Sequence, residues 1–296
     1  MSRKTLLSAA AALAAVGLLA SCASGTASGD AAGSDEPITI GVVGAADEQW
    51  KIFEAKAEEA GIEVEIVDFQ DYAQPNPALT QGELDLNQFQ HLKYLSEYNV
   101  AAGEDLVPIA ATAVYPLGLY SKQFSSVEEI PEGAEIAIPN DPSNLARALL
   151  VLQDAGLVVL RDGGSAYSTE ADVLPESKVK VTPVSAEQTA IALNSIAASI
   201  INNDFVTDAG LEPTDALYQD DAGSEGARPY INVWVARADD ADNPAYAKIV
   251  ELFKETEVQD ALVAQSGGTA VLANQTAEEL QGYLADIQAD TESAQD

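Results

Sequence analysis

From residue 38 onward the hydrophobic pattern switches repeatedly between the two-residue period of strands and the longer period of helices. Strands are predicted at residues 38–44, 62–69, 84–87, 106–114, 135–139, 179–184, 198–201 and 230–237. Helices are predicted at residues 47–60, 78–81, 89–98, 141–156, 187–193, 202–209, 244–253, 258–265 and 277–290. The alternation predicts an α/β fold with a largely parallel sheet, and its length and two successive patterns predict two lobes.

The N-terminal segment has the pattern of an export signal. Arg3 and Lys4 precede an apolar run at residues 6–20. A run of about fifteen residues suits a secretory signal, because a stable membrane span needs about twenty. We therefore expect a signal peptide at residues 1–21.

The end of this run carries the only cysteine of the chain. Leu19-Ala20-Ser21-Cys22 resembles the lipobox of bacterial lipoproteins, in which cleavage precedes the cysteine and its thiol receives diacylglycerol. The small polar residues 22–37 then form a flexible tether. Two or more acyl chains would hold the protein on the extracytoplasmic face of the cell membrane. The alternative is a plain secretory signal with an incidental cysteine.

Composition narrows the function mainly by exclusion. The chain has 48 acidic and 14 basic residues, a net charge of −34, which argues against nucleic acid as a partner. One cysteine excludes a disulfide within the chain, and one histidine excludes a site that needs two imidazoles. No phosphate-binding GxxxxGK[ST] loop occurs, and Gly223-Ser224-Glu225-Gly226 does not match the GxSxG nucleophile motif. No catalytic residue, metal or cofactor is predicted.

Two segments concentrate ligand-binding chemistry, and the first contains Phe89, His91 and Tyr94. The predicted helix at residues 89–98 would place His91 and Tyr94 on one face, since they are three residues apart. With Phe89 they would form an aromatic wall with polar tips. The alternative is a histidine that caps a helix or completes the hydrogen bonding of the core.

The second segment opens the predicted helix at residues 141–156. Asp141 as N-cap and proline at the first helical position are a strong start signal. Asn140 stands just outside this helix N-terminus, where free N–H groups favour an anion. Arg147 shares a face with Asn144 and can bind a carboxylate through two hydrogen bonds. The alternative partner of Arg147 is one of the 48 acidic side chains of the chain.

Four motifs follow one another along the chain: Phe69-Gln70-Asp71-Tyr72 with Pro75-Asn76, Phe89-Gln90-His91 with Tyr94-Leu95, Tyr115-Pro116-Leu117-Gly118 with Tyr120-Ser121, and Asn140-Asp141-Pro142-Ser143-Asn144 with Arg147. In this order they resemble the motifs of the NlpA family of methionine-binding lipoproteins, which serve ABC importers. Ile201-Asn202 and Pro229-Tyr230-Ile231-Asn232 resemble two later segments of the family. The resemblance spans residues 38–237.

This resemblance implies a two-lobed periplasmic-binding-protein fold, type II-like, with the ligand cleft between the lobes. Lobe 1 would comprise residues 38–118 and 230–296, and lobe 2 residues 119–229. The implied protein is a monomer that captures L-methionine or D-methionine and delivers it to an ABC permease and ATPase complex. Open alternatives are another amino acid, a methionine-containing dipeptide or a small anion, and then an enzyme on this scaffold or a structural lipoprotein.

The resemblance also implies roles for individual residues. Arg147 would hold the ligand carboxylate with help from Asn144 or Asn140, and Asn202 and Asn232 would bind the ammonium and carboxylate groups. A polarisable thioether packs well against aromatic rings. The side chains expected around it are Tyr72, Phe89, His91, Tyr94 and Tyr115.

Overall fold

The computed structural model describes residues 36–295. The predicted signal peptide at residues 1–21, the lipidation site Cys22 and the predicted tether up to residue 35 lie outside the described residues. Within residues 36–295, no helix has the length and apolar character that a membrane crossing requires.

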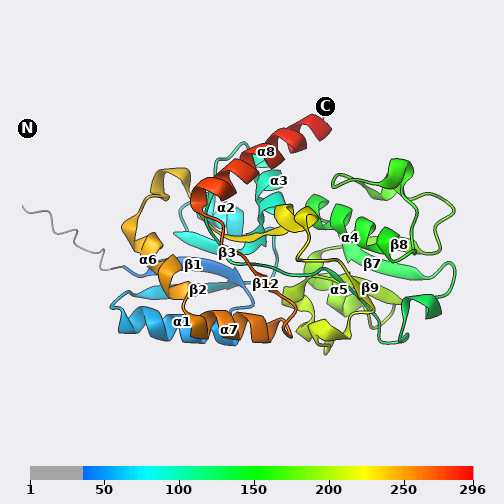
Figure 1. The fold of residues 1–296 in the computed structure, drawn as a ribbon, viewed down its shortest axis with the longest axis horizontal. Helices are drawn as coiled ribbons and strands as arrows, with labels where there is room; N and C mark the ends of the chain where they lie inside the picture. Colours follow the sequence, from blue (N-terminus) through cyan, green and yellow to red (C-terminus); the bar gives the residue numbers. More distant parts are fainter. Residues whose placement is uncertain (1–35, 296) are drawn as a thin grey trace, which may run out of the picture. The chain divides into compact units, whose positions relative to one another are not determined.

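Two five-stranded sheets carry the fold (Figure 1). The first has the strand order β2 (Val64–Phe69), β1 (Ile38–Val43), β3 (Leu86–His91), β11 (Asn232–Ala236) and β4 (Val107–Ala111). The second has the order β10 (Tyr218–Gln219), β6 (Gly118–Tyr120), β9 (Ala198–Ile201), β7 (Glu135–Pro139) and β8 (Lys180–Val184). A two-stranded sheet joins β12 (Val271–Leu272) to β5 (Ala113–Val114).

The strands are parallel on one side of each large sheet and antiparallel on the other. β1 runs parallel to β2 and β3, and β7 runs parallel to β8 and β9. β11 is antiparallel to both β3 and β4, and β6 is antiparallel to β9 and β10. The prediction of a largely parallel sheet is therefore wrong for these strands, because β11 and β6 enter their sheets from the opposite end. The chain leaves the first sheet after Ala111 and returns to it at Asn232.

Helices cover both faces of each large sheet (Figure 1). On the first sheet, α1, α6 and α7 pack on one face, and α2, α3 and α8 pack on the other. On the second sheet, α4 and α5 lie on opposite faces. The helices are α1 (Glu48–Glu59), α2 (Pro75–Thr80), α3 (Leu92–Ala102), α4 (Pro142–Asp154), α5 (Ala186–Ala192), α6 (Pro244–Phe253), α7 (Thr256–Gln265) and α8 (Ala277–Gln295).

An aromatic cluster fills the core on one face of the first sheet. Trp234 of β11 lies 6.0 Å from Trp50, 6.1 Å from Phe53 and 5.2 Å from Phe253, measured between ring centroids. All four side chains are at most 1% exposed. Aromatic pairs at these separations add to the free energy gained from apolar burial, so α1, α6 and β11 are held together at this cluster.

The structure corrects the predicted helix at residues 89–98. Strand β3 continues through His91, and α3 begins only at Leu92. The cause is the neighbouring strand, because β11 pairs with β3 at Asn232 opposite His91 and at Val233 opposite Gln90. His91 and Tyr94 therefore do not share a helix face; His91 is the N-cap of the helix that contains Tyr94.

Two other predicted helices differ from the structure. Helix α2 begins at Pro75, because proline is favoured in a first helical turn, whereas the prediction placed the start at residue 78. The predicted helix at residues 202–209 is a pair of 3₁₀ turns, Asn203–Phe205 and Thr207–Ala209.

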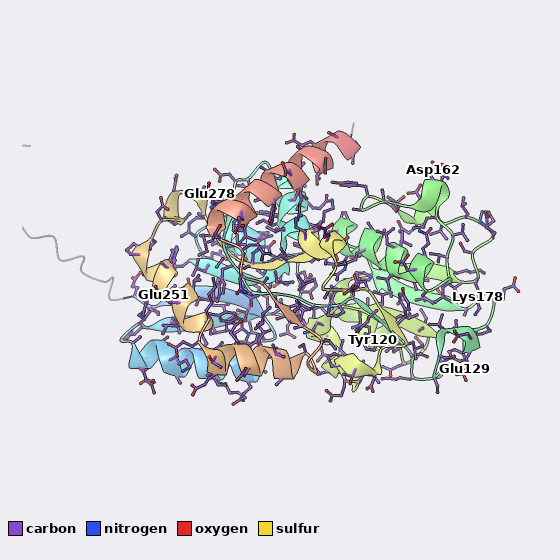
Figure 2. The ribbon with its side chains drawn as sticks, in the orientation of Figure 1. Tyr120, Glu129, Asp162, Lys178, Glu251 and Glu278 are labelled. Atoms are coloured by element: carbon purple, nitrogen blue, oxygen red, sulfur yellow. The ribbon has the colours of Figure 1, made fainter. Side chains whose placement is uncertain are left out.

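The acidic residues of the chain are spread over its surface. Figure 2 labels the exposed side chains of Glu129, Asp162, Glu251 and Glu278 on four separate elements. No group of three or more His, Cys, Asp and Glu side chains within residues 36–295 is arranged to hold a metal ion.

Candidate functional site

A cavity of about 40 Å³ lies where the two large sheets approach each other. Its walls come from the ends of β3 and β9 and from the start of α4, which follows β7. In open α/β sheets the carboxyl ends of parallel strands form the usual ligand crevice. Nine of the predicted site residues line this cavity: Tyr72, Phe89, His91, Tyr94, Tyr115, Asn144, Arg147, Asn202 and Asn232. The tenth, Asn140, is exposed and does not line it.

One wall of the cavity is a cluster of aromatic rings that meet tilted or edge to face. The ring centroid of Tyr72 lies 5.8 Å from that of Phe89 and 6.1 Å from that of Tyr94, and Phe89 lies 5.7 Å from Tyr94. Phe205, which the sequence analysis missed, backs this wall at 5.1 Å from Tyr72. The wall offers polarisable ring surface to an apolar side chain.

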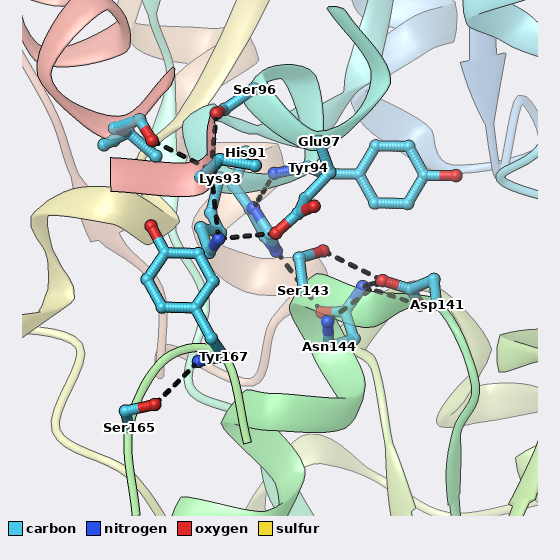
Figure 3. Close-up of polar contacts among 12 residues, drawn as sticks. His91, Lys93, Tyr94, Ser96, Glu97, Asp141, Ser143, Asn144, Ser165 and Tyr167 are labelled. Carbon is cyan, nitrogen blue, oxygen red and sulfur yellow. Dashed lines mark hydrogen bonds and ion pairs between the residues drawn. The ribbon is translucent and has the colours of Figure 1, made fainter. Parts of the chain in front are cut away.

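His91 caps a helix and also lines the cavity. Its Nδ1 accepts a hydrogen bond from the Tyr94 backbone N–H at 3.0 Å (Figure 3). The ring proton therefore resides on Nε2, which lies 3.3 Å from Oδ1 of Asn144. Burial, together with the positive charge of Arg147, lowers the His91 pKa to about 3. The imidazole is neutral at physiological pH.

A chain of hydrogen bonds starting at Asp141 sets the orientation of the asparagines. The Asn144 side-chain amide donates to both carboxylate oxygens of Asp141, at 3.0 and 3.1 Å (Figure 3). Oδ1 of Asn144 is then an acceptor, and it receives Nδ2 of Asn202 at 3.0 Å. The helix cap recognised in the sequence thus also orients the Asn202 side chain, whose Nδ2 is held by Asn144.

Arg147 is 4% exposed and is bound on three sides by protein groups. Its Nε donates to Oδ2 of Asp220 at 2.6 Å, and its Nη2 donates to Oδ1 of Asp220 at 3.1 Å. Nη2 also donates to the Tyr115 carbonyl at 2.9 Å, and the guanidinium lies 4.1 Å from the ring centroid of Tyr230. The acidic partner that the sequence left open is therefore Asp220, yet Arg147 still lines the cavity.

Another part of the cavity wall is acidic. Asp204 lines it, and Oδ2 of Asp204 accepts a hydrogen bond from the Tyr72 hydroxyl at 2.6 Å. Burial and the nearby carboxylate of Asp47 raise the Asp204 pKa to about 7. Burial and the Asp68 carboxylate likewise raise the Asp47 pKa to about 6.

A buried lysine beside the cavity wall joins three segments. Lys93 is 1% exposed, and its ammonium group pairs with Glu97 at 2.5 Å (Figure 3). The same group lies 3.7 Å from the ring centroid of Tyr167 and 3.4 Å from the Thr291 hydroxyl. The segment that carries Tyr167 is thereby attached to α3 and α8.

Several residues that line the cavity or contact Arg147 were not predicted from the sequence, for identifiable reasons. Asn203 and Asp204 directly follow Asn202, but only the turn after β9 directs them to the cavity. Asp220 carries no local signal, since it is one of 48 acidic residues. Tyr230 lies in a motif that the sequence analysis quoted, but its contact with Arg147 depends on the tertiary structure.

Because the pKa of His91 is lowered, we expect its imidazole to remain neutral, without titrating, around physiological pH. Because the chain has one histidine, its imidazole gives a single set of NMR signals. We expect these signals to shift little between pH 5 and 8 in the folded protein. The unfolded chain binds the proton more readily, so the free energy of unfolding should fall as pH drops from 6.5 toward about 3, by up to about 1.4 kcal/mol per pH unit. A titration midpoint between pH 5 and 8 would contradict the buried neutral assignment.

Known proteins resemble this chain over most of its length. The model of the NlpA lipoprotein family matches residues 38–273. The D-methionine-binding lipoprotein MetQ of Yersinia pestis is 39% identical over 240 residues, which cover 79% of this chain and 87% of that relative.

Two solved structures are similar in fold and sequence. The substrate-binding protein of a methionine transporter from Streptococcus pneumoniae has a TM-score of 0.74 at 35% identity, covering 80% of this chain and 95% of the other. A nutrient-binding protein from Burkholderia cenocepacia, solved with methionine bound, has a TM-score of 0.74 at 36% identity, covering 80% and 99%.

Proposed function

Because the chain belongs to the NlpA lipoprotein family, we propose that it is a substrate-binding protein that captures methionine for an ABC importer. The observation that carries this proposal is the cavity, which combines a buried guanidinium, oriented asparagines and an aromatic wall. A zwitterion can leave water only where each charge finds a partner. The relatives named for methionine binding support the same ligand.

Each part of the ligand has a proposed partner in the cavity. Arg147 holds the carboxylate, with Asn144 beside it on α4. Asn202 and Asn232 hydrogen-bond the polar end of the amino acid. The thioether packs against Tyr72, Phe89, His91, Tyr94 and Tyr115, where sulfur–aromatic contacts contribute about 0.3–1.5 kcal/mol each.

The two lobes that would close over the ligand are residues 38–118 with 230–296, and residues 119–229. Several hydrogen bonds span the cavity between these ranges: Tyr72 to Asp204, His91 to Asn144, and Arg147 to the Tyr115 carbonyl. Because the chain passes between these ranges at only two points, near residues 118 and 230, the two lobes could open as rigid bodies. Opening would break these contacts and admit the ligand.

The proposed context is the extracytoplasmic face of the cell membrane. A diacylglyceryl group on Cys22 would anchor the protein in the membrane, and residues 22–37 would connect this anchor to the folded part of the chain. The partner that receives methionine would be an ABC permease and ATPase complex, which a single monomer of this chain would serve. The named relatives are binding proteins, and we propose no enzymatic step.

The proposed function predicts that the protein carries or binds methionine. Mass spectrometry of the small molecules released on denaturing the purified protein should detect methionine. Calorimetric titration after removal of that ligand should show saturable heat with L-methionine, D-methionine or a methionine-containing dipeptide. A ligand at one hundred times its Kd stabilises the folded protein by about 2.7 kcal/mol, so the melting temperature should rise as well.

Leucine and sulfate serve as comparison ligands for another amino acid and a small anion. Saturable binding of either one, with no heat from any methionine compound, would overturn the ligand assignment while keeping the binding class.

A further inference from the structure

Asn202 and Asp204 line the cavity on the turn that follows β9, and one acceptor of Asn202 lacks a donor among the described residues. Because Asn202 donates its Nδ2 to Asn144, its Oδ1 faces away from that bond. In the described part of the chain this Oδ1 is buried and accepts no hydrogen bond. A buried acceptor without a donor is costly, and such an atom in a ligand cavity indicates a donor on the ligand.

Asp204 lies on the same turn, and its carboxylate has no positively charged partner within the described chain. The Tyr72 hydroxyl occupies its Oδ2, a neutral contact that leaves the negative charge without a counter-ion. Among residues 36–295, no lysine, arginine or histidine forms an ion pair with Asp204. The other groups that face Asp204 are Asp47, which repels its charge, and the neutral phenol of Tyr115.

The raised pKa of Asp204 has the same physical origin. A half-buried carboxylate near another carboxylate, with no cation beside it, holds its proton more tightly than in water. A cation beside Asp204 would stabilise the carboxylate, lower its pKa and so release the proton. Arg147 does not supply that charge, because its guanidinium is already paired with Asp220.

From these contacts we propose that Asp204 binds the ammonium group of the ligand and selects compounds with a free amino group. This inference rests on the proposed function, since it assigns one charge of the same ligand. Asp204 and Asn202 would form the subsite for the ammonium group, and Arg147 would hold the carboxylate. The ligand class is an α-amino acid or a peptide with a free N-terminus, and N-acylated compounds are excluded.

The Asp204→Asn variant separates charge recognition from the contact between the lobes. Asparagine keeps the side-chain shape and an oxygen that can accept from the Tyr72 hydroxyl, so the hydrogen bond across the cavity is retained. The negative charge is lost, and an NH2 group replaces the second carboxylate oxygen. The matched control is Asp208→Asn, which removes an exposed carboxylate from the next 3₁₀ turn.

The test compares two ligands on the purified full chain by calorimetry. L-methionine carries the ammonium group, and 4-methylsulfanylbutanoate keeps the thioether and the carboxylate without it. We expect Asp204→Asn to weaken binding of L-methionine by about 30-fold or more, because an ammonium group loses its counter-charge. The same variant should change the affinity for the des-amino analogue by less than about threefold, and Asp208→Asn should change neither.

Proton release gives a second readout that a merely structural role would not move. Because its pKa is raised to about 7, Asp204 carries a proton in a fraction of the molecules near neutral pH before ligand binds. Titrations in two buffers of different ionisation enthalpy should show release of a fraction of a proton per methionine bound. Release should vanish in Asp204→Asn, and the affinity of the unaltered protein should rise as pH increases through 7.

The outcomes distinguish this inference from the proposed function. If the unaltered protein binds methionine and Asp204→Asn binds it equally well, the ammonium assignment is overturned and the methionine function stands. If methionine affinity falls in Asp204→Asn and the analogue's affinity falls as much, the residue only supports the cavity, and the inference is again overturned. If the unaltered protein binds no methionine compound, both fail.

Discussion

Replacing Arg147 with alanine is expected to weaken methionine binding by about 3–5 kcal/mol, a loss of at least a hundredfold in affinity. Arg147 is 4% exposed, so a ligand carboxylate that binds to it leaves water and needs its positive charge. Without it the ligand carboxylate would lie near Asp220, whose own partner has been removed. Calorimetric titration of the variant with L-methionine measures the effect.

Two further variants make this result interpretable. Arg228→Ala removes an exposed arginine that stacks on Tyr283 outside the cavity, and it should leave the affinity unchanged. The double variant Arg147→Ala with Asp220→Asn relieves the unpaired carboxylate, so a fold weakened by that charge should recover while methionine binding does not. Normal affinity in a folded Arg147→Ala protein would refute the proposed carboxylate role.

Replacing Trp234 with alanine is expected to lower the free energy of unfolding by about 3–5 kcal/mol. Trp234 is fully buried on β11, between β3 and β4, and contacts the rings of Trp50, Phe53 and Phe253. Truncation would leave a cavity inside a rigid aromatic cluster that cannot collapse to fill it. Urea unfolding followed by circular dichroism measures the change.

The control for this prediction is Ile191→Ala on α5. Ile191 is 57% exposed, so its truncation should change the free energy of unfolding by less than about 0.5 kcal/mol. Equal effects of the two substitutions would show that the aromatic cluster does not dominate the stability of the first sheet.

Local signals in the sequence were sufficient where an element depends on its own residues. Helix α4 begins at Pro142 after the Asp141 cap, as its sequence predicted, because capping and proline geometry act within one turn. Strand β7 also matches its predicted range, residues 135–139, because a short apolar run next to a helix start has few alternatives. The same local signals predicted that Asn144 and Arg147 lie on one helix, as they do.

The structure around His91 could not be predicted from local sequence patterns. Residues 89–91 were predicted as the start of a helix, but pairing with β11, more than 140 residues away in the chain, makes them the end of strand β3. That pairing brings Asn232 opposite His91, which puts both at the cavity. No pattern within the segment contains this information, because register is set by the partner strand.

By itself the sequence determined the chemistry of the candidate site. It supplies an arginine, in a chain where 14 basic residues face 48 acidic ones, together with several asparagines and aromatic side chains in recognisable motifs. Only the tertiary structure decided how these groups are paired. It gave Arg147 the partner Asp220, oriented Asn202 through Asp141, and left Asp204 without a counter-ion at the cavity. The physical reason is that charges and hydrogen bonds are paired in space, whereas capping and apolar periodicity act along the chain.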